Sequence, residues 1–133
     1  MRISKVEDRR NISRWQLLLF LPVFDSNSDE LFGYVADITT EGLLVLSKKP
    51  IDTNQPFDLE IRVDDMKEAL LYQEGETDKD IKFTVQSRWA ARDKQQDFYR
   101  TGLMFVDLPP QIAVSVRRLV RIVFRNTLPS EYK

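Results

Sequence analysis

Residues 57–63 read Phe57-Asp58-Leu59-Glu60-Ile61-Arg62-Val63, a strict alternation of apolar and charged side chains. Successive side chains of a β-strand point to opposite faces, so this pattern predicts a strand with one face in a core and the other in water. Several short segments before and after residues 57–63 also have sequence patterns typical of β-strands.

Upstream, the chain predicts three further strands. Residues 15–24 are apolar on both alternating faces, which indicates a strand that is covered on both sides or lies at a partner interface. Residues 25–29 have turn composition, and residues 31–38 resume an extended pattern with the even-numbered residues expected on one face. The two strands form an antiparallel hairpin, and residues 43–47 form the next strand.

Downstream, residues 81–92 predict a long strand with Trp89 facing inward, and residues 98–106 predict a sixth strand. The segment between residues 64 and 80 holds seven acidic and two basic side chains. Its part from Met66 to Tyr72 suits either a short helix or a continued strand, and the rest is expected to be a solvated loop.

The period of the apolar residues changes after Pro109-Pro110. Apolar side chains then fall at positions 112, 116, 119, 120 and 123, which lie on one face of a helix of about four turns. We expect the helix to end before Pro129. Six short strands and one amphipathic helix predict a mostly β fold, a six-stranded antiparallel β-barrel with a C-terminal α-helix. The helix caps one opening or packs outside the barrel.

Composition excludes several classes of function. The chain of 133 residues predicts one domain, and it contains no cysteine and no histidine. Disulfides, Cys/His zinc sites, haem ligation by these residues, and Ser-His-Asp or Cys-His catalysis are therefore impossible. The chain has 20 basic and 21 acidic residues and a net charge of −1. This balance disfavours a DNA-binding protein and a protein that binds membranes through a polybasic segment. The longest apolar run, residues 17–21, is too short to span a bilayer, and we expect the protein to be cytoplasmic.

A first candidate site is the cluster of Arg9, Arg10 and Arg14 just before the first predicted strand. The planar arginine fork donates two parallel hydrogen bonds to a phosphate or to a guanine edge, and it stacks on bases. By charge pattern alone, a solvated basic tail is the more common explanation.

A second candidate site lies between the second and third predicted strands and contains Asp37, Thr39 and Gly42. A carboxylate there can accept from guanine N–H donors or cap the turn, and a threonine hydroxyl can donate to a phosphate or bond its own backbone. Glycine permits a positive φ and close approach of a ligand. Taken alone, this cluster is more often a plain turn.

The two clusters together resemble the signature of the PilZ domain family, RxxxR followed by (D/N)xSxxG. Here Arg10-x-x-x-Arg14 is followed, after 22 residues that form one hairpin, by Asp37-x-Thr39-x-x-Gly42. Residues 99–105, with the pattern G-x-x-F, also look like a late strand of this family. The family resemblance implies a six-stranded barrel that binds cyclic di-GMP, a bacterial second messenger, on its surface.

Carried over by position, the resemblance implies that Arg10 and Arg14 hold phosphates and guanine edges. It implies that Asp37 and Thr39 meet a guanine and that Gly42 shapes the turn. The family usually has serine where this chain has Thr39, so the additional methyl group is expected to crowd the ligand and to weaken binding while the hydroxyl is kept.

Arg9 adds a further expectation of the same kind, because an arginine before the first motif arginine accompanies an intercalated ligand dimer in this family. We expect residues 1–14 to form a flexible arginine-rich arm that is mobile when empty, and residues 15–133 to form the barrel and helix as one domain.

The predicted function is a regulatory module that is not an enzyme and needs no metal or other cofactor. Such a module acts through an unidentified protein partner or as a homo-oligomer. The alternative is a PilZ-like interaction module that does not bind the nucleotide, which the retained arginines disfavour. Arg117, Arg121 and Arg125 recur every four residues and form either a solvated face or a docking stripe for an acidic partner. We expect Trp15 and Trp89 to be packing residues.

Overall fold

The computed structural model describes residues 21–69, 79–93 and 97–131, with side chains described as far as residue 122. The elements are β1 (Pro22–Asp25), β2 (Leu31–Ile38), β3 (Gly42–Ser47), β4 (Pro56–Ile61), α2 (Val63–Glu68), β5 (Ile81–Asp93), β6 (Phe98–Phe105) and α3 (Pro110–Glu131).

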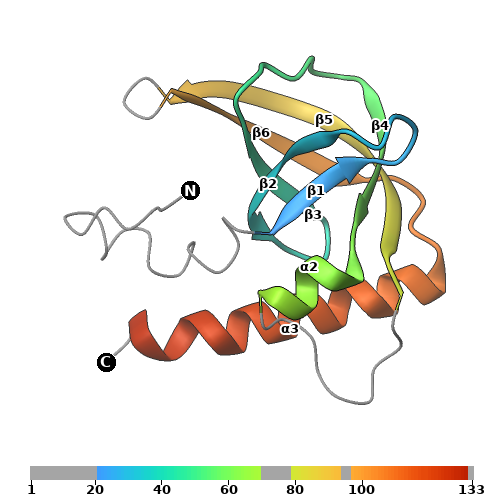
Figure 1. Cartoon of the computed structure of the whole chain (residues 1–133), viewed down its shortest axis with the longest axis vertical. Helices are drawn as coiled ribbons and strands as arrows, with labels where there is room; N and C mark the ends of the chain where they lie inside the picture. Colours follow the sequence, from blue (N-terminus) through green and yellow to red (C-terminus); the bar gives the residue numbers. More distant parts are fainter. Residues whose placement is uncertain (1–20, 70–78, 94–96, 132–133) are drawn as a thin grey trace.

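The strands form a closed barrel in the order β1-β2-β3-β6-β5-β4, and every neighbouring pair is antiparallel (Figure 1). The barrel closes at the short pairing of β1 with β4, where Phe24 lies opposite Glu60 and Asp25 opposite Leu59. Closure gives every strand two hydrogen-bonded neighbours, so no strand offers a free edge along its whole length to a partner chain. The predicted fold class is confirmed.

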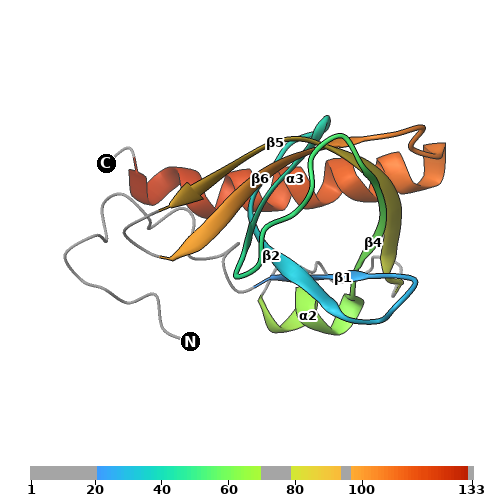
Figure 2. The ribbon, with the colours of Figure 1, turned by 90° about the horizontal axis from the view of Figure 1, so that it is seen from above.

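The core fills the inside of the barrel with aliphatic side chains from all six strands. Val23, Val35, Val45, Leu59 and Val85 are fully shielded from solvent. Helix α3 lies below the strands in Figure 1 and passes along the β5–β6 side in Figure 2. Its buried side chains Val116, Leu119 and Ile122 belong to the same core cluster, so the helix completes the core.

Helix α3 is longer than the sequence predicted. It contains 22 residues and its backbone stays helical through Pro129, so the prediction that it ends before this proline was wrong. The fixed φ of proline is close to the helical value, so the last turn continues at the loss of one N–H donor. The predicted apolar face is correct at Val116 and Leu119, both of which are buried.

Helix α2 decides the alternative that the sequence left open for residues 66–72 as far as Glu68, and residues 70–72 lie outside the described ranges. The chain forms a short helix there, and its Met66 is buried in the core. The helix has no side-chain cap from Arg62; instead the backbone N–H of Val63 donates to the Asp80 carboxylate at 2.9 Å. Burial raises the pKa of Asp65 in the first turn of this helix above its ordinary value.

Residues 1–20 are outside the described ranges, and so is most of the predicted strand 15–24. Of that strand, β1 represents residues 22–24, together with Asp25. The predicted division into an arm of residues 1–14 and a barrel of residues 15–133 stays a prediction.

A β-bulge in β2 changes which residues of this strand face inward. Val35 lies opposite Val45, but the next pair is Asp37 with Leu44, so Ala36 is an additional residue. The prediction that the even-numbered residues of β2 share one face was therefore wrong for the first half of the strand, where Val35 is the fully buried residue. Because the bulge inverts the alternation, Asp37 is exposed on the outer face instead of entering the core.

A second bulge has the same effect in β5. Ser87 lies opposite Leu103, and the next pair is Trp89 with Gly102, which leaves Arg88 as the additional residue. Without the bulge, Trp89 would follow Ser87 into the interior, as the sequence predicted. Its side chain instead lies on the outer face with 47% of its surface exposed, so the expectation of an inward packing residue was wrong.

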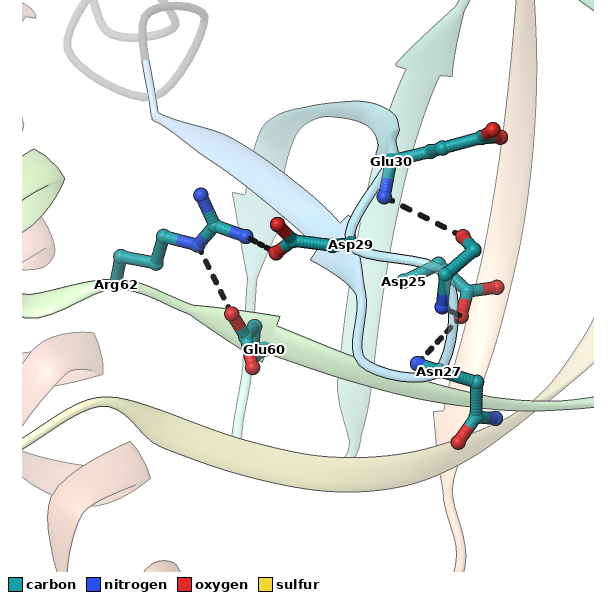
Figure 3. Close-up of polar contacts among 7 residues, drawn as sticks. Asp25, Asn27, Asp29, Glu30, Glu60 and Arg62 are labelled. Carbon is teal, nitrogen blue, oxygen red and sulfur yellow. Dashed lines mark hydrogen bonds and ion pairs between the residues drawn. The ribbon is translucent and has the colours of Figure 1, made fainter.

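The turn between β1 and β2 is held by its own side chains (Figure 3). The Oδ1 of Asp25 accepts hydrogen bonds from the backbone N–H groups of Asn27 at 2.8 Å and Ser28 at 3.1 Å. Asp29 adopts a φ of 66°, which is a left-handed conformation that aspartate tolerates. The predicted turn chemistry is confirmed.

Arg62 joins this turn to β4 (Figure 3). Its Nε donates to Glu60 at 2.9 Å, a second nitrogen forms an ion pair with Asp29, and the guanidinium lies 3.7 Å from the centre of the Phe24 ring. The hydrogen bond to Glu60 is the main cause that raises the pKa of Arg62 above its ordinary value, so this residue stays cationic. Glu60 is only 8% exposed, and Arg62 is the cation that compensates its buried charge.

We predict that Arg62→Met lowers the free energy of unfolding, because Glu60 would remain buried without its cation and the contact with Phe24 would be lost. Arg92→Met is the matched control, because Arg92 forms an ion pair with Asp97 in which both side chains are more than half exposed. Urea denaturation should give a lower midpoint for the first variant and an unchanged midpoint for the second. Equal midpoints for the two variants would contradict this role of Arg62.

Candidate functional site

The turn between β2 and β3 carries the second predicted cluster. The Oδ1 of Asp37 accepts a hydrogen bond from the backbone N–H of Ile38 at 2.9 Å. The N–H of Thr39 donates to the carbonyl of Gly42 at 2.9 Å, and the N–H of Glu41 donates to Thr39 Oγ1 at 3.1 Å. The plain turn chemistry is therefore present. It still leaves a second oxygen on the Asp37 carboxylate and the hydroxyl proton of Thr39 for a ligand.

Gly42 is required by the approach of β6 to β3, and its φ is not in the left-handed region. A Cβ at this position would lie 1.9 Å from the carbonyl oxygen of Leu103, far inside van der Waals contact. Glycine is therefore needed at position 42 because the β3 and β6 backbones lie close together there, and not because the turn requires a positive φ. The close approach fixes where the turn, and with it Asp37 and Thr39, lies relative to β6.

The registers of four strands place Asp37, Leu44, Gly102 and Trp89 in one row across the outer face of the barrel. Asp37 and Trp89 are at the two ends of the row, three strand spacings or about 14 Å apart along the backbone. Leu44 and Gly102 lie between them. A small residue at the third position leaves room over the sheet between the carboxylate and the indole.

A pocket with a volume of about 390 Å³ lies over this part of the sheet. It brings together the predicted site residues Asp37, Thr39 and Gly42 with Arg88, Trp89 and Met104, which were not predicted to bind a ligand. Trp89 and Met104 are among the large apolar side chains with substantial exposure, at 47% and 39%. The pocket thus combines hydrogen-bonding side chains with exposed apolar surface.

The indole of Trp89 is held against Gly102. A Cβ on Gly102 would lie 2.3 Å from Nε1 and 2.6 Å from Cε2 of the indole, so only glycine permits this contact. The ring therefore covers the β6 backbone while about half of its surface remains open to solvent. An aromatic surface and a carboxylate that line the same pocket are suited to a planar ligand with hydrogen-bond donors on one edge.

The described lining of the pocket carries two carboxylates, from Asp37 and Glu41, and one guanidinium, from Arg88. A dianionic ligand therefore needs further cations. The predicted arginines Arg9, Arg10 and Arg14 lie outside the described residues, so their position relative to the pocket stays a prediction.

Sequence reasoning did not identify Arg88 as a site residue, and it predicted Trp89 as an inward packing residue. Their place in the pocket depends on the β5 bulge, which alternation does not reveal. One available signal was Gly102, because a glycine inside a strand often marks a close approach of another group.

A family model for the PilZ domain matches residues 8–125 of the chain. The chain belongs to the PilZ domain family. The matched segment includes both predicted motifs, the whole barrel and most of α3, in agreement with the resemblance found in the sequence. No curated protein matches the chain significantly.

Two solved structures are similar to this PilZ domain. The inhibitor of motility MotI/DgrA from Bacillus subtilis has a TM-score of 0.57 and 15% identity, covering 80% of this chain and 46% of that chain. The PilZ domain of YcgR from Escherichia coli, solved with c-di-GMP, has a TM-score of 0.54 and 12% identity, covering 80% of this chain and 83% of that chain. The chain thus spans less than half of MotI/DgrA, and at these identities the likeness shows the fold.

Within the described ranges, no three acidic side chains gather in a way that could hold a metal ion. Asp64, Asp65 and Glu68 from the acidic segment lie on or beside α2, and residues 70–78 are outside the description. No helix among the described residues is long and apolar enough to cross a membrane.

We predict that Gly42→Ala destabilises the domain more than Gly102→Ala does. In Gly42→Ala the new methyl group meets the β6 backbone, and overpacking of this kind costs about 1–3 kcal/mol. In Gly102→Ala it meets a side chain that can rotate away, so the main effect is displacement of Trp89. Urea denaturation measures the first effect, and tryptophan emission measures the second. A larger loss of stability in Gly102→Ala would show that β3 and β6 can separate at low cost.

Proposed function

We propose that this PilZ domain is a cyclic di-GMP receptor, in which the pocket binds a guanine and the N-terminal arginines close over the nucleotide. The observation that carries the proposal is the convergence of Asp37, Thr39 and Gly42 with Trp89 on one pocket. The family assignment supports the same ligand, since the PilZ domain of YcgR was solved with c-di-GMP.

Guanine suits the two ends of this pocket. Its N1–H and N2–H₂ donors match a carboxylate acceptor, and Asp37 keeps one oxygen that is not used by the turn. The exposed face of Trp89 provides a stacking surface for the purine ring. The apolar side chains of Leu44 and Met104 lie along the pocket between and beside these groups.

The two phosphates of the ligand need donors that the described lining supplies only in part. The Thr39 hydroxyl can donate to one of them while its oxygen continues to accept from Glu41 N–H. Arg10 and Arg14 provide forks that suit phosphate and the guanine O6/N7 edge. Seven residues lie between Arg14 and Pro22 at the start of β1, and the eight Cα–Cα steps span at most about 28 Å, which is a length that allows Arg14 to reach the pocket.

Closure of the arm is the proposed signal. An arm that is mobile without ligand loses conformational entropy when it is ordered, and the binding energy of the nucleotide compensates this cost. The ordered arm then presents a new surface to a protein partner or to a second copy of the chain. In this proposal the protein acts in the cytoplasm and transmits binding without chemical turnover of the nucleotide. Arg9 adds a third fork if the ligand binds as an intercalated dimer.

The second candidate is a PilZ interaction module that does not bind the nucleotide. The retention of Arg10, Arg14 and Asp37 favours the receptor. The two candidates differ in a direct binding experiment.

We predict that isothermal titration calorimetry with cyclic di-GMP detects binding to the wild-type chain and that Arg10→Ala weakens it at least about tenfold, because a charge-assisted contact is lost. Two ligands per chain would support the role given to Arg9. Arg92→Ala, on the exposed β5–β6 end, is the matched control and should bind as wild type. Absence of binding by calorimetry and by a second method would favour the interaction module.

We predict that Trp89→Ala weakens cyclic di-GMP binding by about 1–3 kcal/mol, or roughly 5- to 150-fold, because the stacking surface for the guanine is removed. Trp89→Phe keeps an aromatic face and should retain most of the affinity. Equal affinities for the wild type and the alanine variant would place the guanine away from the β5 end of the pocket.

A further inference from the structure

Arg100 occupies an unusual position on the outer wall of the barrel. Thr101 and Leu103 are buried inside, so the alternation of β6 places Arg100 on the same outer face as Gly102. Its cross-strand neighbours on that face are Leu46 of β3 and Ala91 of β5. Both are apolar, so neither provides a charge or a side-chain acceptor for the guanidinium.

The guanidinium of Arg100 also has an unsatisfied donor. Its Nε is buried and donates no hydrogen bond to any residue within the described ranges. Arg62 and Arg92 behave differently, since each pairs with a carboxylate. A buried donor without a partner destabilises a protein by about 1–3 kcal/mol, so such a group calls for an explanation, of which a bound partner is one.

The proposed nucleotide site lies directly beside this residue. Arg100 precedes Gly102 on the outer face by one strand repeat, about 7 Å along β6. Gly102 is part of the pocket and touches the Trp89 indole. The row of Arg100 also contains Tyr34, which pairs with Pro22 at the beginning of β1, the point where the N-terminal segment joins the barrel. Arg100 therefore lies beside the pocket, in the row of residues that leads across β3 and β2 to the start of β1.

We propose that Arg100 is an additional ligand-binding residue, which donates from the rigid barrel wall to a phosphodiester oxygen of the bound nucleotide. This inference rests on the proposed function. The pocket supplies a carboxylate and an aromatic surface for the base, and Arg100 supplies a fixed cation for the phosphate beside it. Arg100 therefore contributes to binding before the arm is ordered.

The test compares Arg100→Met with the wild type in two measurements on the full chain. Methionine keeps an apolar stem against Leu46 and removes the unpaired N–H, so urea denaturation without ligand should give an unchanged or higher midpoint. Calorimetry with cyclic di-GMP should give an affinity about tenfold lower or more. The affinity of the wild type should also fall more steeply with NaCl than that of the variant, because the lost contact joins two opposite charges.

Arg92→Met is the matched control, since it removes an exposed arginine from the same strand pair and should change neither measurement. Arg100→Lys keeps the charge without the planar fork and should bind with intermediate affinity. Wild-type affinity in Arg100→Met, or a large loss of stability without ligand, would overturn the role of Arg100 while leaving the receptor intact. Absence of binding to the wild type would overturn the proposed function, and this inference with it.

Discussion

A closed barrel of six strands must point one face of every strand into a common core, and the rest of this structure depends on how that alternation is kept. The core accepts aliphatic side chains and small polar groups such as Ser87 and Thr101. A charged or large aromatic residue in phase with them would have to be buried. Two bulges prevent this, because the additional residues Ala36 and Arg88 invert the alternation before Asp37 and Trp89 are reached.

The pocket is a consequence of these two inversions. They lie on strands that are separated by β3 and β6, and they turn one acceptor and one aromatic ring toward the same stretch of outer surface. Gly42 of β3 and Gly102 of β6 then shape the floor of the pocket. Gly42 lets the two backbones approach, and Gly102 lets the indole lie flat on the sheet. A rigid wall of this kind can hold a planar base without reorganisation, which reduces the entropic cost of binding.

Two arginines on different parts of the barrel, Arg62 and Arg100, have different surroundings. At the β1–β2 turn, Arg62 compensates the buried Glu60 and joins the turn to β4, with Nε bonded to Glu60 and a second nitrogen paired with Asp29 (Figure 3). On the outer wall, Arg100 keeps a buried Nε that has no partner among the described residues. The first arginine stabilises the fold, and the second is available to an anion. In the proposed receptor, the N-terminal arginines complete the site to which Arg100 contributes.

The sequence by itself determined the class of the fold and the part of the pocket at the β2–β3 turn. The period of the apolar residues is a local property of one strand or helix, so the strands and the buried face of α3 could be predicted, and turn composition indicated the turns. The motif of Asp37, Thr39 and Gly42 could be recognised directly in the sequence. Only the tertiary structure decided that Trp89 faces outward and that the Nε of Arg100 has no hydrogen-bond partner among the described residues. Bulges and cross-strand neighbours depend on which residues of distant strands come to lie opposite one another, and a single chain pattern does not contain that register.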